Sequence, residues 1–160
     1  MKAKLVVEGK EFDIEILDPK LQELIVPKKK TGYERVDNNC VYYANYHDGT
    51  VASYQELNGN FSKGAYGTAN YYSSEIVAEN NVRADNLMRQ LRRFAVERRT
   101  KDDPTEKYYI HYIKTVGLQI MRSTDKHIGP WFDTLRNAAQ AIEAFKDELI
   151  WYFTEYKDSL

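Results

Sequence analysis

Apolar and polar residues alternate along residues 3–8 and again along 11–17, which is the period of half-buried β-strands. Gly9-Lys10 lies between the two segments, and glycine is common in the tight turn of a β-hairpin. The pattern therefore predicts a β-hairpin at the N-terminus.

A helix signal and a linker follow this hairpin. Asp18-Pro19 combines a residue that caps helices with one that suits the first helical position, which predicts a short helix over 20–25. Residues 27–32 begin with proline, contain three consecutive lysines and end in glycine, a composition typical of a solvated linker. We therefore expect residues 1–32 to form an appendage of a β-hairpin and a short helix.

The rest of the chain contains one pattern twice. A YYxxY segment begins at Tyr42 and again at Tyr108, and a turn and a return strand follow each one, at 51–56 and 118–122. Such a repeated order is the sequence signature of duplicated supersecondary units.

An aromatic pair and a helix complete each copy. The pairs are Tyr71-Tyr72 and Trp131-Phe132. Each pair is expected to end a short third strand, with Ser73 or Asp133 as the N-cap of the following helix. The sequence thus predicts an α+β protein with two tandem ββ(β)α units, 33–103 and 104–160.

Both predicted helices are long and amphipathic, over 74–99 and 134–157. Their apolar residues recur every three or four positions. These residues are Val77, Ala84, Leu87, Leu91 and Phe94 in the first helix, and Leu135, Ala138, Ile142, Phe145, Leu149, Tyr152 and Tyr156 in the second. The first helix would be ~39 Å long, longer than its strands. By default we expect its overhang to pack on the second helix. The alternatives are that it packs on another chain, as in a homodimer, or on nothing.

Composition limits the class of protein. The 160 residues have a formal net charge of −1 and an ordinary apolar fraction, which suits one globular domain and gives no overall attraction to nucleic acid. The single cysteine, Cys40, excludes an intramolecular disulfide and is expected to be half-buried at a strand start. No apolar run has the length of a membrane span or a signal peptide, so a cytoplasmic protein without a membrane partner is expected.

Catalytic and metal-binding patterns are missing from the sequence. His47, His111 and His127 lie in a predicted turn, strand and loop, without the spacings typical of zinc sites. Residues 64–68 are glycine-rich, but an aromatic segment separates them from the next helix, so a flexible loop is predicted there instead of a phosphate-binding loop. We expect no enzyme activity, no cofactor and no metal.

The second half of the first helix is basic, with seven basic and two acidic residues over 83–101. On a helical wheel Arg89, Arg92, Arg93 and Arg99 share one face, opposite the apolar positions, while Arg98 falls on the apolar side. This face could be plainly solvated, could bind phosphates or an acidic protein surface, or could lie beside the more acidic second helix.

Trp151 lies away from the main apolar stripe of the second helix. Either the N-terminal hairpin covers Trp151, or Trp151 is exposed. An exposed Trp151 would be an anchor for a partner, because Trp and Arg are enriched in binding hot spots. The candidate partner-binding residues are Arg89, Arg92, Arg93, Arg98, Arg99 and Trp151.

Five segments carry a family resemblance: 28–36, 70–75, 91–95, 129–134 and 145–149. With them, nearly the whole chain resembles small proteins encoded in phages and prophages, some of which look like anti-CRISPR inhibitors of type II (Cas9) effectors. The resemblance implies a non-enzymatic inhibitor that binds a Cas9-type effector of the bacterial host in the cytoplasm. The alternative is a nucleic-acid-binding accessory module that uses the arginines on phosphates and tyrosines as stacking platforms.

Overall fold

The fold is that of a computed structural model, which describes residues 2–7, 10–15, 30–100, 105–124 and 129–156. The chain divides into two compact units, residues 1–31 and residues 32–160. Gly32 belongs to the second unit, where its carbonyl accepts a hydrogen bond from the backbone N–H of Ser73 (2.8 Å).

The first unit contains the predicted hairpin. Strands β1 (Lys2–Val7) and β2 (Lys10–Glu15) pair antiparallel, and the register places Val7 opposite Lys10. Lys10 is therefore a strand residue and not part of the turn, contrary to the sequence prediction. The helix predicted over 20–25 lies outside the described residues.

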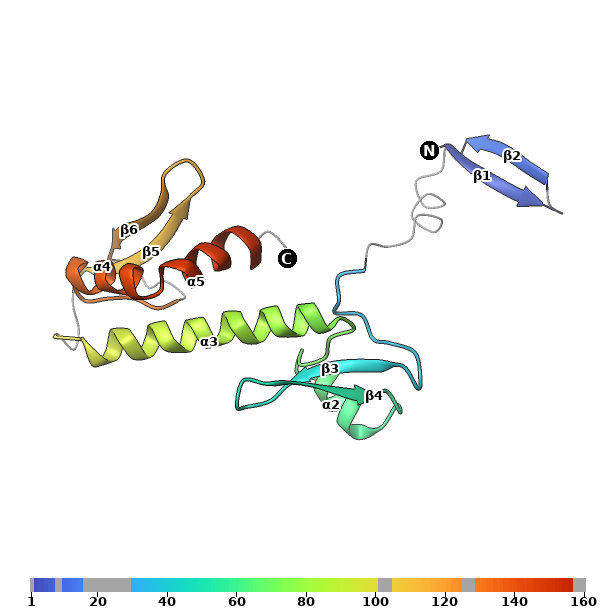
Figure 1. The fold of residues 1–160 in the computed structure, drawn as a ribbon, viewed down its shortest axis with the longest axis horizontal. Coiled ribbons are helices and arrows are strands. Elements are labelled where there is room, and N and C mark those ends of the chain that lie inside the picture. The colour runs from blue at the N-terminus through green and yellow to red at the C-terminus, as the bar shows by residue number, and fades with distance from the viewer. Residues whose placement is uncertain (1, 8–9, 16–29, 101–104, 125–128, 157–160) are drawn as a thin grey trace. The chain divides into compact units, whose positions relative to one another are not determined.

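The second unit is a mixed α+β structure, which confirms the predicted class (Figure 1). In chain order its elements are β3 (Val41–Asn45), β4 (Val51–Gln55), α2 (Asn60–Gly67), α3 (Glu75–Glu97), β5 (Lys107–Ile113), β6 (Gly117–Ser123), α4 (Leu135–Ala144), α5 (Lys146–Trp151) and the π-helix η1 (Tyr152–Tyr156). The strands form two separate antiparallel hairpins, β3–β4 and β5–β6.

The predicted repeat is visible in the backbone pairing. Each hairpin forms one further antiparallel bridge to the aromatic pair before its helix, Tyr43 to Tyr72 and Tyr108 to Phe132. Both bridges have two hydrogen bonds of 2.8–2.9 Å. The third strand is therefore a single bridge residue in each copy, shorter than predicted.

Helix α3 packs against elements of both copies of the repeat. Near its start Ala78 is fully buried, and α3 contacts both strands of the first hairpin. Farther along, the buried side chains Leu87, Leu91 and Ala95 pack in one core with Phe132 and Leu149. The overhang thus packs against the second copy, as the default prediction had it, so the free helix end on which the expected homodimer depended does not exist.

The second long helix is not continuous, which corrects the prediction over 134–157. Phe145 leaves helical geometry (φ −123°, ψ 22°) between α4 and α5, and the last turn is a π-helix. Leu135, the first residue of the predicted stripe, is 56% exposed. The kink allows Phe145 to stack edge-on against Phe94 (5.5 Å between ring centroids) while Leu149 still enters the core.

Two local predictions also change. Residues 64–67, predicted as loop, form the end of α2, because Ala65 packs against the buried Tyr42 and Tyr71. Cys40 is exposed, and not half-buried, because it precedes β3 at the end of the hairpin.

The predicted helix caps are each shifted by one residue. The caps are Ser74 and Thr134, and the Thr134 side chain accepts a hydrogen bond from the backbone of Asn137. The preceding residues, Ser73 and Asp133, bond instead to Glu34 and Thr100, which are distant in sequence. The polar side chains that sequence alone assigned to capping are therefore hydrogen-bonded to residues distant in the chain.

The buried carboxylate of Glu56 links several segments of the first copy through hydrogen bonds. Glu56 is 0% exposed and accepts hydrogen bonds from Arg35, Asn58, Ser62 and Tyr71 at 2.6–3.2 Å. The hydrogen bond from Arg35 is the largest of the effects that lower the pKa of Glu56 to about 2. A charge at this depth needs such a set of partners, so the network fixes the chain before β3, the end of β4 and the start of α2 to one another.

Among the described residues, no helix is both long and apolar enough to cross a membrane.

Candidate protein-binding surface

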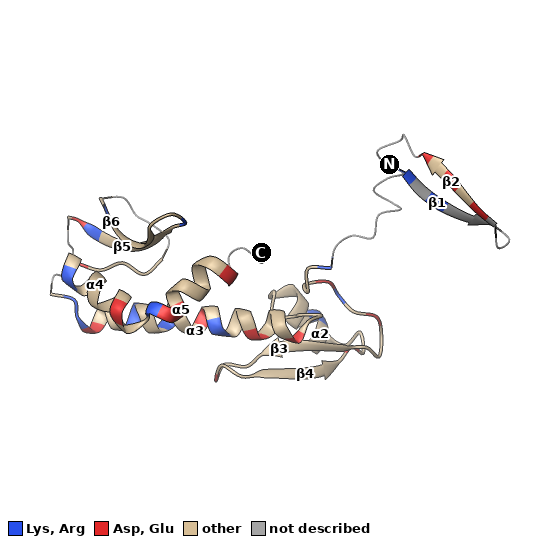
Figure 2. Ribbon diagram, turned by 45° about the horizontal axis from the view of Figure 1, so that its top comes forward, with Lys and Arg blue, Asp and Glu red and all other residues tan. Residues whose placement is uncertain are grey.

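Three of the six candidate residues lie together on the solvent side of α3. Arg89, Arg92 and Arg93 are exposed, while Leu87 and Leu91 on the opposite side are buried. Residues three and four apart are neighbours on a helix surface, so the three guanidinium groups share one face. Figure 2 shows the basic and acidic positions along this helix. We call Arg89, Arg92 and Arg93 the arginine face.

The three arginines differ in whether they already form an ion pair. Arg93 donates a hydrogen bond to Glu97 (2.8 Å), one turn farther along, and this bond raises the pKa of Arg93 and lowers that of Glu97. Arg89 and Arg92 form no ion pair with any residue that the structure describes. Their guanidinium groups remain available for a carboxylate or phosphate of a partner.

Arg98 and Arg99 do not belong to this face. For Arg99 this corrects the grouping made from the helical wheel, which had already placed Arg98 on the apolar side. Helix α3 ends at Glu97, so both residues lie beyond the last helical position. The guanidinium of Arg98 stacks on Phe94 (3.7 Å to the ring centroid), and that of Arg99 stacks on Trp131 (4.1 Å). Both arginines therefore already have an aromatic partner, Phe94 of α3 itself for Arg98 and Trp131 of the second copy for Arg99.

Trp131 carries a second cation on its ring. The ammonium group of Lys107 lies 4.8 Å from its centroid, so two positive charges share one indole. Cation–π contacts of this kind hold long side chains in place at a surface. The sequence identified Trp131 only as half of an aromatic pair, because its partners lie 24 and 32 positions away along the chain.

Trp151 is buried and is not an exposed anchor. The residues that cover it belong to the second unit, residues 32–160. It is 7% exposed, with the Arg83 guanidinium 3.9 Å from its ring centroid and the Tyr156 ring at 5.7 Å. Arg83 also donates two hydrogen bonds to Glu148, at 2.8 and 2.9 Å. These bonds raise the pKa of Arg83 and lower that of Glu148. The predicted charge complementarity between the two helices is therefore present, through Arg83.

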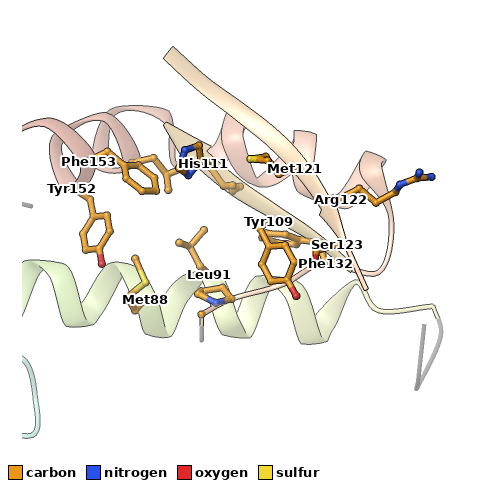
Figure 3. Close-up of a pocket in the computed structure, with 14 residues that line it drawn as sticks. Met88, Leu91, Tyr109, His111, Met121, Arg122, Ser123, Phe132, Tyr152 and Phe153 are labelled. Atoms are coloured by element: carbon orange, nitrogen blue, oxygen red, sulfur yellow. The ribbon is translucent and has the colours of Figure 1, made fainter. Parts of the chain in front are cut away.

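An open cavity of about 510 Å³ lies between α3, the β5–β6 hairpin and the C-terminal helices. Figure 3 shows Met88 and Leu91 of α3 on one side of it and Tyr152 and Phe153 on another. Its lining is mostly apolar, and its one histidine, His111, has no carboxylate or cysteine beside it in the lining.

The described residues also contain no group of three or more metal-ligating side chains. No protein family, curated protein or solved structure matches this chain. The arginine face is therefore the feature of the candidate set that the structure leaves open for an interaction.

Proposed function

We propose that this protein is a phage- or prophage-encoded, non-enzymatic inhibitor of a host defence system, an anti-CRISPR protein that binds a Cas9-type effector. The resemblance of nearly the whole chain to such phage proteins motivates the target. The observation that carries the mode of action is the arginine face, where Arg89 and Arg92 point to solvent from a helix whose other side is buried.

A fixed helix is a suitable carrier for such a surface. Leu87, Leu91 and Ala95 pack in the core and hold α3 in place. The backbone that carries the exposed side chains is therefore already ordered before binding. Arginine forms bidentate bonds with carboxylates and is enriched in interface hot spots. We therefore assign Arg89 and Arg92 to contact with an acidic patch on the effector.

The charge of the chain favours a particular kind of inhibition. An inhibitor that mimics duplex DNA needs a strongly acidic surface, whereas this chain has a net charge of −1 and presents arginines. Inhibition by occupying a protein surface, or by restraining a conformational change of the effector, fits this charge better than DNA mimicry.

The direct test is a DNA-cleavage assay with guide-loaded Cas9 orthologues from several type II systems, with and without the full chain. The proposal predicts dose-dependent loss of cleavage by at least one orthologue. Arg89→Glu combined with Arg92→Glu should abolish that inhibition. The matched control, Arg136→Glu with Lys146→Glu, changes the same charge at exposed positions of α4 and α5 and should retain it. Full cleavage by every orthologue would refute the Cas9 target.

The same two arginines support one alternative, a nucleic-acid-binding module in which they contact phosphates. Its signature is an affinity for DNA or RNA that falls steeply as salt rises. Binding of labelled single- and double-stranded oligonucleotides, measured over a series of salt concentrations, separates the two functions. The anti-CRISPR proposal predicts no such binding at physiological salt.

A further inference from the structure

The hairpin β3–β4 has two edges, and its hydrogen bonds show which groups face each one. The N–H of Tyr46 donates to Thr50 and that of Glu56 donates to Cys40, both at 2.8 Å. In an antiparallel pair the hydrogen-bonded positions alternate with positions whose N–H and C=O groups point away from the partner strand. On β4 the outward groups are therefore those of Val51, Ser53 and Gln55.

The outer edge of β3 is covered at two of its three outward positions, Tyr43 and Asn45. Tyr43 exchanges two hydrogen bonds with Tyr72. Two residues along, the side-chain amide of Asn70 accepts from the N–H of Asn45 (2.7 Å) and donates to its carbonyl (2.9 Å). The side chain of Asn70 thus takes the place of a backbone partner, and the outward groups of two successive β3 positions are satisfied.

The outer edge of β4 is not covered in this way. No residue that the structure describes hydrogen-bonds to the outward backbone groups of Val51, Ser53 or Gln55. In Figure 1, β4 forms the side of the hairpin away from α3. Natural proteins protect such edges with charged residues, prolines or bulges, and the sequence of β4, VASYQ, has neither a charge nor a proline.

We propose that two copies of this chain pair through their β4 edges, antiparallel, with Ser53 at the two-fold axis. The three outward positions are evenly spaced about Ser53, so this register brings Ser53 opposite Ser53 and Val51 opposite Gln55 of the other copy. All outward groups of both edges are then hydrogen-bonded. The arrangement is self-complementary, as a two-fold interface must be, and brings no like charges of the two strands together.

Exposed apolar side chains near this edge favour a protein occupant. Leu57 is 64% exposed and Phe61 is 63% exposed, and both closely follow β4 in the chain. The Phe61 ring contacts Tyr54 of β4 (5.0 Å between centroids), which places it next to the edge strand. Pairing of β4 with a second copy extends the sheet beside these side chains and removes part of their surface from water.

The test uses the full chain in size-exclusion chromatography with light scattering, from about 10 to about 300 µM. The proposal predicts an apparent mass that rises with concentration from 18.7 kDa towards twice that value. Ser53→Lys places two ammonium groups opposite each other at the axis, and Ser53→Pro removes an outward N–H without breaking a β3–β4 bond. Each variant should weaken the dimer at least about tenfold. Gln140→Lys, at an exposed position of α4, is the charge-matched control and should leave it intact.

A mixing experiment guards against variants that fail through misfolding. Ser53→Glu alone should be monomeric, and an equal mixture with Ser53→Lys should form a heterodimer, because opposite charges then meet at the axis. Backbone exchange adds a position-specific signature: at high concentration the amides of Val51, Ser53 and Gln55 should become protected. A wild-type chain that stays monomeric throughout, or a dimer that survives both Ser53→Lys and Ser53→Pro, would overturn the proposal.

Discussion

Asp133 offers a quantitative test of how the second copy is joined to α3. Its carboxylate is 7% exposed and accepts hydrogen bonds from the Thr100 N–H (2.6 Å), the Thr100 hydroxyl (2.7 Å) and the Asn137 amide (2.8 Å). Burial favours the neutral acid, but these hydrogen bonds together favour the anion more strongly and lower the pKa of Asp133 to about 2. The anion thus ties the chain after α3 to the start of α4.

The size of the effect follows from this shift. From the ordinary value of 3.8 to about 2, at about 1.36 kcal/mol per pKa unit, the folded state gains ~2 kcal/mol from ionised Asp133. Thr100 is exposed, so solvent screening reduces this gain. Asp133→Asn removes the charge and places an amide donor against a donor. We expect it to lower the free energy of unfolding by about 1–2 kcal/mol at neutral pH.

Urea denaturation of the wild type and the variant, from about pH 7 to about pH 2, measures this quantity. The folded-state pKa is depressed, so the contribution is fully present above the unfolded-state value and disappears as the pH falls towards 2. The difference between the two proteins should therefore shrink over that interval. Asp37→Asn, at an exposed position, is the control and should cost little. A cost for Asp133→Asn that equals the control, or that does not change with pH, would show that the ionised Asp133 carboxylate does not stabilise the fold.

Three further predictions concern stability. Glu56 also has a folded-state pKa of about 2, so the wild type should lose stability as the pH falls from about 4.5 to about 2, and Glu56→Gln should flatten this dependence in urea titrations. Leu149→Ala, in the core shared with α3, should lower the free energy of unfolding by about 2–5 kcal/mol. Gly32→Ala should cost about 1–3 kcal/mol by thermal denaturation, because φ is +88° and the new Cβ would lie 2.6 Å from Val77 Cγ2. Equal stability of any of these variants and the wild type at all pH values would contradict the corresponding contact.

Regular patterns made much of the fold predictable. Alternation of apolar and polar residues located the N-terminal hairpin, and the repeated YYxxY segments with their turns located the other two. The helical period located α3 to within two residues at each end. The duplication could be inferred because aromatic residues occupy the same two places in each copy: the first strand, and the pair that bridges back to it at Tyr72 and Phe132. These features are local in sequence, so the pattern of neighbouring residues predicts them.

The features that could not be predicted depend on contacts between distant residues. The apolar period runs through Phe145 without a glycine or proline, so nothing local marks the kink between α4 and α5. At the start of each helix two adjacent polar residues could act as the N-cap. Ser73 and Asp133 do not, because they bond to Glu34 and Thr100, which are far away in the chain.

The candidate surface shows the same division. The helical period correctly placed Arg89, Arg92 and Arg93 on one exposed face. It could not show that Arg99 stacks on Trp131 or that Arg83 covers Trp151, because each pair joins segments that meet only in the folded chain. Half of the arginine and tryptophan residues singled out from the sequence therefore support the fold instead of the open surface.

The most direct test of the account is calorimetric titration of guide-loaded Cas9, from an orthologue whose cleavage the protein inhibits, with wild-type chain and with the Arg89→Glu, Arg92→Glu variant. Contact through the arginine face predicts saturable binding by the wild type and at least about a hundredfold weaker binding by the variant, since two interface arginines become acidic. The Arg136→Glu, Lys146→Glu control should bind as the wild type does. Equal binding by wild type and the Arg89, Arg92 variant would show that the arginine face is not the contact surface.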